Sequence, residues 1–318
     1  MQHTVRSDVT LTGVGVHSGV ETHLTVSPAA SGTGIVFVRS DVTDRDNRIP
    51  ATYDRVRDTR LCTVIANDAG VSVGTIEHLL AALAACAIDN VEITLDGPEV
   101  PILDGSSALF ITAIESVGRT TQAAPRRVLR ILKDVTVQDG NAIVTLKPSM
   151  GMKFRADIEF PHQLIGAQGY ELDLMEGRFA QDVAAARTFG FYHEVAYLRQ
   201  QGLALGGSLE NAIVLDQQAG TILNPEGLRF KDEFARHKLL DAVGDLYLAG
   251  GAILGAYHGT KAGHAINNRV LHALFERTDA YAWVDLYVDT TTGLREVDMV
   301  PAAMPVPEMI PVAAMAHA

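Results

Sequence analysis

The segment from residue 237 to residue 250, HKLLDAVGDLYLAG, combines a buried-helix pattern with a row of polar side chains. Its leucine and valine residues recur at three- and four-residue steps, as on the apolar face of a helix. His237, Asp241 and Asp245 follow at four-residue spacing, so a helix places an imidazole and two carboxylates in one line. Such a row either binds a metal ion or is a solvated face with a weak i, i+4 ion pair.

A second candidate group is Glu77 and His78, in an Ala/Leu-rich segment where burying a charge is costly unless it is paired or bound to metal. If the two segments meet, His78, His237 and Asp241 supply three ligands and leave a fourth position for water. That is the pattern of a catalytic rather than a structural zinc site. Ligands without thiolate also admit Fe²⁺ or Co²⁺. His264, in GHAINN, is expected in a loop after a strand, where catalytic groups often lie.

The chain has 318 residues and a net charge of −12, with 47% hydrophobic and 20% charged residues. This length predicts two domains. The negative charge argues against a nucleic-acid partner, which would need lysine and arginine patches. Cys62 and Cys86 are too few for a disulfide framework and are expected to be reduced thiols. With no apolar signal core and no 18-residue apolar window, we expect a cytoplasmic protein without a transmembrane segment. No stable protein partner is implied.

Strand and helix patterns alternate along the chain. The polar stretch 119–126 interrupts them and marks the expected boundary between two domains. We predict an N-terminal α+β domain over 1–122, a C-terminal α+β domain over 127–300 and a flexible Pro/Ala-rich tail over 301–318. We also expect a hairpin at 135–146, with Asp-Gly in a type I′ turn. Helices are expected at 74–89, 106–118, 178–187, 231–249 and 266–279.

Two of the expected helices echo each other in sequence. His78-Leu-Leu-Ala-Ala-Leu can be laid on Lys238-Leu-Leu-Asp-Ala-Val, and a short link of small residues and a strand follow each. Two hairpin-rich halves with a matching helix–strand unit predict a duplicated α+β domain. If the two helices face each other, His78 meets His237 and Asp241 between the domains.

Several long stretches resemble the UDP-3-O-acyl-N-acetylglucosamine deacetylases, the zinc amidases of lipid A synthesis in Gram-negative bacteria. The resemblance runs from about residue 3 to residue 285 and leaves out the final thirty or so residues. It implies an α+β fold of two similar domains, each a layered sheet/helix sandwich, with the active site between them. The matching stretches are TGVGVHSG, VRDTRLCTVI, TIEHLLAAL, DNVEITLDGPEVPILDGSS, ARTFGF, GLALGGSLENAIV, LNPEGLRFKDEFARHKLLDAVGDLYLAG and KAGHAINN.

The resemblance implies a metal site and a general base. In that family one zinc ion is bound by a histidine of the first helix and by a histidine and an aspartate of the second. These match His78, His237 and Asp241, a set that also admits Fe²⁺ in the cell. Glu77 matches the general base. Adjacent helical residues point about 100° apart, so Glu77 need not compete with His78 for the metal.

The other catalytic roles rest on the same resemblance. His264 matches the residue that, when protonated, stabilises the oxyanion and can deliver a proton to the amine. Asp245 matches the carboxylate that orients this imidazole and favours its charged form. Thr188, in ARTFGF, matches a hydroxyl donor to the tetrahedral intermediate.

The resemblance also implies a substrate site. Lys238 and Lys261 match positions that meet the diphosphate, and Phe160 is similar to an aromatic residue that stacks on uracil. The family builds its acyl-chain slot from an insert in the second domain, here about residues 189–214. Each wall residue could equally be ordinary core. The candidates are Phe191, Val195, Leu198, Ala204, Gly207 and Ser208.

The expected function is therefore a zinc-dependent hydrolase that removes acetate from UDP-3-O-[(3R)-3-hydroxyacyl]-N-acetylglucosamine, the committed step of lipid A biosynthesis. A non-catalytic module that binds a nucleotide sugar or an acyl chain is a second hypothesis. It is disfavoured because a competent residue occupies every catalytic position that can be matched. A metal-dependent hydrolase of another acylated sugar is a third.

Overall fold

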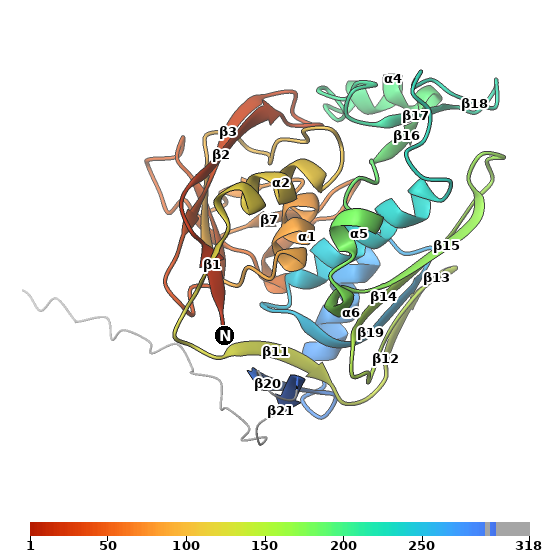
Figure 1. The fold of residues 1–318 in the computed structure, drawn as a ribbon. Helices are drawn as coiled ribbons and strands as arrows, with labels where there is room; N and C mark the ends of the chain where they lie inside the picture. Colours follow the sequence, from red (N-terminus) through yellow and green to blue (C-terminus); the bar gives the residue numbers. More distant parts are fainter. Residues whose placement is uncertain (290–292, 297–318) are drawn as a thin grey trace, which may run out of the picture.

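The computed structural model describes residues 1–289 and 293–296, and the tail predicted at 301–318 lies outside them. Figure 1 shows two sheets as outer layers with four helices between them: α1 (Glu77–Ala85), α2 (Ala108–Val117), α5 (Glu233–Tyr247) and α6 (His264–Phe275). This arrangement is the α+β fold that the sequence predicted. Within the described part of the chain, no helix has the length and apolar character needed to cross a membrane.

The N-terminal sheet has the strand order β2-β3-β9-β4-β5, with β4 parallel to β9 and the other neighbours antiparallel. Along β3 the residues Thr22, Leu24 and Val26 are buried in alternation, because one face of the sheet packs on helices. The strands and helices are β2 (Val9–Val14), β3 (Glu21–Pro28), β9 (Val91–Leu95), β4 (Ile35–Arg39), β5 (Arg48–Pro50), α1 (Glu77–Ala85) and α2 (Ala108–Val117).

The C-terminal sheet is built around β19, which is antiparallel to β13 and parallel to both β14 and β11. Outside these strands lie β12, β15, β20 and β21. The strands are β11 (Arg126–Ile131), β12 (Val135–Asp139), β13 (Ala142–Lys147), β14 (Met152–Phe160), β15 (Gly166–Asp173), β19 (Ile253–Thr260), β20 (Tyr281–Asp289) and β21 (Gly293–Glu296).

The two sheets share a strand order. The path β2-β3-β9-β4-β5 of the first corresponds to β12-β13-β19-β14-β15 of the second, with the same parallel and antiparallel neighbours. In each half a helix, α1 or α5, comes before the central strand and another, α2 or α6, follows it. This correspondence supports the proposal of a duplicated unit, while the domain limits remain a prediction.

The helix α5 (Glu233–Tyr247) packs directly against α1. A Cβ atom on Gly244 would lie 2.0 Å from the carbonyl oxygen of Glu77, so this approach requires glycine. Glycine inside a helix costs roughly 0.5–1 kcal/mol relative to alanine. In return, the first turn of α1 reaches the polar row of α5.

The segment that follows Thr188 forms a small lobe of β16 (Phe189–Phe191), α4 (Tyr192–Gln200), β17 (Ile213–Asp216) and β18 (Thr221–Ile222), at the top of Figure 1. The lobe is bonded to the N-terminal half. The backbone N–H of Leu205 donates to the carbonyl of His17 at 3.1 Å, and that of Gly206 donates to Val16 at 3.1 Å. Both halves of the chain therefore hold the lobe.

The other described elements are β1 (His3–Val5), η1 (Tyr53–Arg55), β6 (Val56–Asp58), β7 (Val64–Ala66), β8 (Ser72–Val73), β10 (Arg119–Thr121), η2 (Leu174–Glu176), α3 (Phe179–Asp182) and α6 (His264–Phe275).

The helix predicted at 178–187 is wrong beyond its first turn, because α3 ends at Asp182. The following residues lead to Arg187, whose backbone N–H and Nε both donate to the buried carboxylate of Glu233, at 3.0 and 2.9 Å. This tertiary ion pair overrides the helix propensity of the alanines before it.

Two local predictions are also corrected. The hairpin at 135–146 is present, but Asp139 pairs with Ala142, so Gly140 and Asn141 form the turn. Only Gly140 has a positive φ, 56°, which indicates a type II′ rather than a type I′ turn. His264, expected in a loop, is the first residue of α6.

Candidate active site

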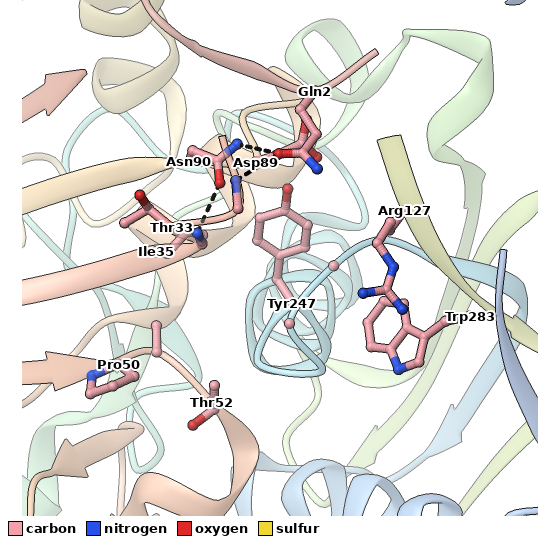
Figure 2. Close-up of a pocket in the computed structure, with 15 residues that line it drawn as sticks. Gln2, Thr33, Ile35, Pro50, Thr52, Asp89, Asn90, Arg127, Tyr247 and Trp283 are labelled. Atoms are coloured by element: carbon pink, nitrogen blue, oxygen red, sulfur yellow. Dashed lines mark hydrogen bonds between the residues drawn. The ribbon is translucent and has the colours of Figure 1, made fainter. Parts of the chain in front are cut away.

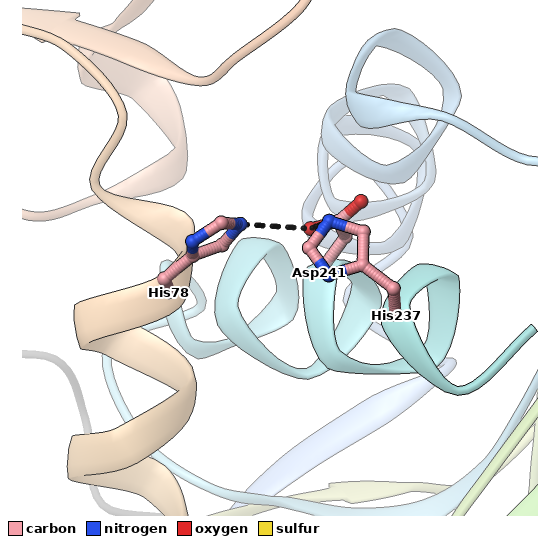
Figure 3. Close-up of side chains that lie close together, drawn as sticks. All are labelled: His78, His237 and Asp241. Atoms are coloured by element: carbon pink, nitrogen blue, oxygen red, sulfur yellow. Dashed lines mark ion pairs between the residues drawn. The ribbon is translucent and has the colours of Figure 1, made fainter. Parts of the chain in front are cut away.

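Three candidate metal ligands meet between α1 and α5 (Figure 3). His78 lies in the first turn of α1, and His237 and Asp241 lie one turn apart on α5. Asp241 Oδ1 is 3.5 Å from His78 Nε2 and 3.4 Å from His237 Nε2. All three side chains are buried. The structure thus brings together residues that are about 160 positions apart in the sequence.

The geometry of these residues fits one divalent metal ion. Ligand atoms bound to zinc at about 2.0–2.1 Å with tetrahedral angles are about 3.3 Å apart. The buried Asp241 Oδ1 has no hydrogen-bond partner, which is costly unless a cation satisfies it. His237 Nδ1 lies 3.1 Å from the carbonyl oxygen of Ala186 and donates to it, which leaves the Nε2 lone pair facing Asp241.

The charges of the ligands suit a metal site. Burial lowers the pKa of His237 to about 3, so the imidazole is neutral at pH 7, as a ligand must be. Burial raises the pKa of Asp241, but His237 and the Lys238 ammonium hold that pKa well below its usual range. Lys238 Nζ donates to Asp241 Oδ2 at 2.5 Å.

Glu77 and His264 face each other beside the ligands. Glu77 Oε1 lies 3.9 Å from His264 Nε2, and Oε2 accepts the backbone N–H of Thr63 at 3.1 Å. Burial raises the pKa of Glu77, although His264 and His78 oppose that effect. A carboxylate with a raised pKa is suited to accept a proton near neutral pH.

Asp245 holds the other side of the His264 ring. His264 Nδ1 lies 2.9 Å from Asp245 Oδ2. Burial alone would lower the pKa of His264, but the Asp245 and Glu77 carboxylates outweigh it and raise the pKa to about 9. The ring is therefore an imidazolium at pH 7, with a proton on the Nε2 that faces Glu77.

Three residues that hold Asp245 and its neighbours could not be predicted from the sequence. The Thr63 hydroxyl donates to Asp245 Oδ1 at 2.6 Å. Asn267 Nδ2 donates to Asp245 Oδ2 at 2.9 Å, and Tyr257 OH donates to Asn267 Oδ1 at 2.7 Å. Thr63 lies in VRDTRLCTVI and Asn267 in KAGHAINN, both quoted for the family resemblance, but neither stretch shows which oxygen its side chain contacts.

Thr188 stands at the point where the lobe leaves the body of the protein. Its backbone N–H donates to the carbonyl of Gly105 at 2.8 Å, and its carbonyl accepts the N–H of Ile213 at 2.8 Å. Two backbone bonds therefore fix the main chain of Thr188, and its side chain is half-buried. Lys238, predicted to bind diphosphate, lies beside the candidate metal ligand Asp241, with Nζ 2.5 Å from Oδ2.

Lys261 and Phe160 lie at the end of the C-terminal sheet. Lys261 forms an ion pair with the exposed Glu159, with Nζ 2.6 Å from Oε2, rather than with a residue of the metal site. The ring of Phe160 lies 5.6 Å from that of Phe189 and 6.3 Å from that of Phe191. Phe160 is thus adjacent to the lobe that carries the predicted acyl slot.

The predicted slot residues share an intermediate exposure, with one exception. Ser208 is exposed, and its Oγ accepts the N–H of Glu210 at 3.2 Å. A Cβ atom on Gly207 would lie 3.9 Å from Val16 of the N-terminal half, so this part of the lobe borders both halves. The half-buried ones are Phe191, Val195, Leu198, Ala204 and Gly207.

Two buried polar residues near the lobe were also missed. Arg187 is 2% exposed and joins the lobe to α5 through its ion pair with Glu233. No short sequence motif predicts such a pair. His162 is 5% exposed, and its ring lies 5.8 Å from that of Phe191. Nothing in the sequence around His162 indicates that the lobe covers it.

A hollow of about 290 Å³ opens at the other end of α5 (Figure 2). Its lining includes Tyr247, whose OH donates to the carbonyl of Ile88 at 2.7 Å, and Asn90, whose Nδ2 donates to Gln2 at 2.8 Å. Both polar groups bond to the protein itself: the Tyr247–Ile88 bond joins the two halves, and the Asn90–Gln2 bond lies within the N-terminal half.

Comparisons with known proteins agree with one another. A family model described as UDP-3-O-acyl N-acetylglycosamine deacetylase matches residues 2–276. Relatives named UDP-3-O-acyl-N-acetylglucosamine deacetylase include one from Phenylobacterium zucineum, 49% identical over 280 residues, which are 88% of this chain and 95% of the relative. One from Shewanella violacea is 47% identical over 285 residues, 89% and 92% of the two chains. One from Shewanella frigidimarina is 46% identical over 305 residues, 95% and 98%.

Proposed function

The chain belongs to the UDP-3-O-acyl N-acetylglycosamine deacetylase family, and we propose that it works with one metal ion bound between α1 and α5. It is a hydrolase that acts on an amide, removing acetate from UDP-3-O-acyl-N-acetylglucosamine in lipid A biosynthesis. The family is metal-dependent; zinc is the proposed ion, and Fe²⁺ suits the same ligands. A (3R)-3-hydroxyacyl chain and the cytoplasm stay predictions for the substrate and the compartment.

The proposed ligands are His78, His237 and Asp241, because they are buried, correctly charged and spaced for one tetrahedral ion. When bound, the ion polarises the amide carbonyl and lowers the pKa of water. Lys238 neutralises the second oxygen of Asp241.

Glu77 and His264 divide the proton transfers. Glu77 Oε1 takes a proton from the attacking water, while its Oε2 is kept in place by the N–H of Thr63. His264 Nε2 carries a proton that stabilises negative charge on the carbonyl oxygen and then passes to the departing amine. Asp245 keeps that imidazole charged and correctly rotated. Thr188 donates its hydroxyl to the same developing oxyanion.

The substrate extends from this centre in two directions. We assign Lys238 and Lys261 to the diphosphate and Phe160 to the uracil ring, by their match to the family. The acyl chain runs along the lobe at about 189–214, where half-buried apolar side chains border both halves of the protein.

The observation that carries this proposal is the convergence of the metal triad and the Glu77–His264 pair in one buried site. The test is acetate release from UDP-3-O-(3-hydroxyacyl)-N-acetylglucosamine, measured together with metal content. A chelator should abolish release, and one equivalent of Zn²⁺ should restore it. Tight substrate binding without acetate release by the metal-loaded protein would show a binding module instead. Equal turnover of the acylated sugar without UDP would contradict the assigned substrate.

A further inference from the structure

Thr63 contacts the carboxylate of Glu77, one of the two proposed proton carriers, and the carboxylate of Asp245, which holds the other carrier, His264. Its backbone N–H donates to Glu77 Oε2 at 3.1 Å, and its hydroxyl donates to Asp245 Oδ1 at 2.6 Å. The residue is 2% exposed, so water does not replace either bond. Thr63 belongs to the N-terminal half and Asp245 to the C-terminal half, 182 positions away.

The Thr63 hydroxyl completes the set of donors around Asp245. Asp245 Oδ2 accepts from His264 Nδ1 and from Asn267 Nδ2, both at 2.9 Å. The Thr63 hydroxyl is the described donor to the other oxygen. Because a buried carboxylate without a partner is costly, this bond determines how the carboxylate is rotated. The rotation in turn decides whether Oδ2 faces His264.

The backbone near Thr63 and near its partner Glu77 has strained conformations. Leu61, two residues earlier, has φ of +68° although it is not glycine. Thr75, two residues before Glu77, has φ of +56°, which is a genuine outlier for a β-branched residue. Such strain persists only where the surrounding structure enforces it, and it clusters at functional sites.

We propose that Thr63 is a positioning residue for the deacetylation: its hydroxyl fixes the Asp245 carboxylate so that His264 is held in its working orientation. This rests on the proposed function of the site. The Thr63 hydroxyl bonds to Asp245, which holds His264, so removing this hydroxyl should act on turnover through Asp245.

A double-mutant cycle on the metal-loaded enzyme tests this inference. Thr63→Val keeps the shape and the backbone N–H but removes the hydroxyl donor. We expect kcat for acetate release to fall about tenfold to hundredfold, as for other partners that orient an active-site group, with KM and metal content retained. Thr63→Ser keeps the donor and should recover most of the lost kcat. In an Asp245→Asn background, Thr63→Val should change kcat less than about twofold, because the two residues act as one unit.

Thr22→Val is a matched control, since Thr22 is buried on β3 and its hydroxyl has no partner; kcat should not change. Equal losses from Thr63→Val in both backgrounds, or unchanged kcat in the Val variant, would overturn the inference. If Thr63→Val does not fold by circular dichroism, Thr63→Ala takes its place under the same criteria. A wild-type enzyme without acetate release would instead refute the proposed function.

Discussion

The helices α1 and α5 occupy the same place in their halves, just before the central strands β9 and β19, but they carry unequal shares of the chemistry. Beyond Glu77 and His78, α1 consists of leucine and alanine. The helix α5 carries two proposed metal ligands, a lysine and the aspartate that holds His264. Where the two sequences are laid together, Asp241 stands opposite Ala81.

This difference shows how two halves with the same strand order can share a single proposed site. One helix supplies two reactive groups at its N-terminal end and an otherwise apolar surface. The other supplies a polar row, and Gly244 lets the row approach the backbone of Glu77. Neither half contains a complete site, so changes on either helix should be comparably damaging.

The largest effect should follow loss of a ligand from either helix. We expect His78→Ala on α1 and His237→Ala on α5 each to reduce bound metal from one equivalent to near zero and activity to background. The variants should stay folded, because the large buried core that runs through both halves does not depend on the metal. Metal analysis and circular dichroism test this pair. Full metal retention by His78→Ala would remove α1 from the metal site.

The next effect concerns the second reactive group of α1. Glu77→Gln should lower kcat by roughly 10²–10⁴, the usual range for a general base, while leaving metal content unchanged. This result would separate the roles of two adjacent residues, with His78 binding the metal and Glu77 accepting the proton. Near-normal single-turnover rates in this variant would show that another group takes the proton.

The contact between the helices can be altered directly. Gly244→Ala should lower the free energy of unfolding by about 1–3 kcal/mol, the usual cost of overpacking, because the new methyl group meets the Glu77 carbonyl. Urea unfolding measures the change. Gly190→Ala is the control, since a Cβ there meets nothing within 4 Å. Equal stability of the two variants would mean that the helices do not need this close approach.

The effect of Asp245 should appear in the pH profile. The raised pKa of His264, about 9, places the alkaline limb of kcat/KM near that pH, because activity needs the imidazolium and is lost as pH rises through its pKa. Asp245→Asn removes the carboxylate that raises this pKa, so the alkaline limb should move toward the ordinary histidine value of about 6.5. A shift of the acidic limb alone would contradict this assignment.

The smallest effect should come from the lysine that lies outside both helices. Lys261 pairs with the exposed Glu159, and solvent screens the charge of a lysine at such an exposed position. We expect Lys261→Ala to raise KM about two- to fivefold at unchanged kcat, consistent with a modest surface contact. Lys238→Ala, beside Asp241, should be more damaging. The reverse order would place the diphosphate nearer to Lys261.

Much of the fold could be predicted because its pattern is local. The α5 helix and the 135–146 hairpin follow from apolar periodicity and a glycine turn. The helix α4 was missed because its side chains are mostly exposed and form no apolar stripe. The helix prediction was wrong for residues 183–187, because the pairing of Arg187 with Glu233, 46 residues away, determines their conformation.

The candidate site divides in the same way. The i, i+4 spacing and the Glu77–His78 pair were visible in the sequence, and the two helices do meet. The donors that hold Asp245 were not visible, because Thr63 and Asn267 reach it only through tertiary packing. Threonine and asparagine are common residues, and nothing in their sequence neighbours distinguishes these two.

The position of β19 has a consequence for the order of folding. It lies between β13 and β14, but it is synthesised roughly a hundred residues after β13. At a synthesis rate of about 5–20 residues per second, β19 is made roughly 5–20 seconds after β13, so the C-terminal sheet cannot form completely before then. The strands of the N-terminal sheet have already left the ribosome by that time. During that interval Glu77 and His78 have no partners from α5 or α6. A chain that is still being translated should therefore be catalytically silent until its last quarter has been made.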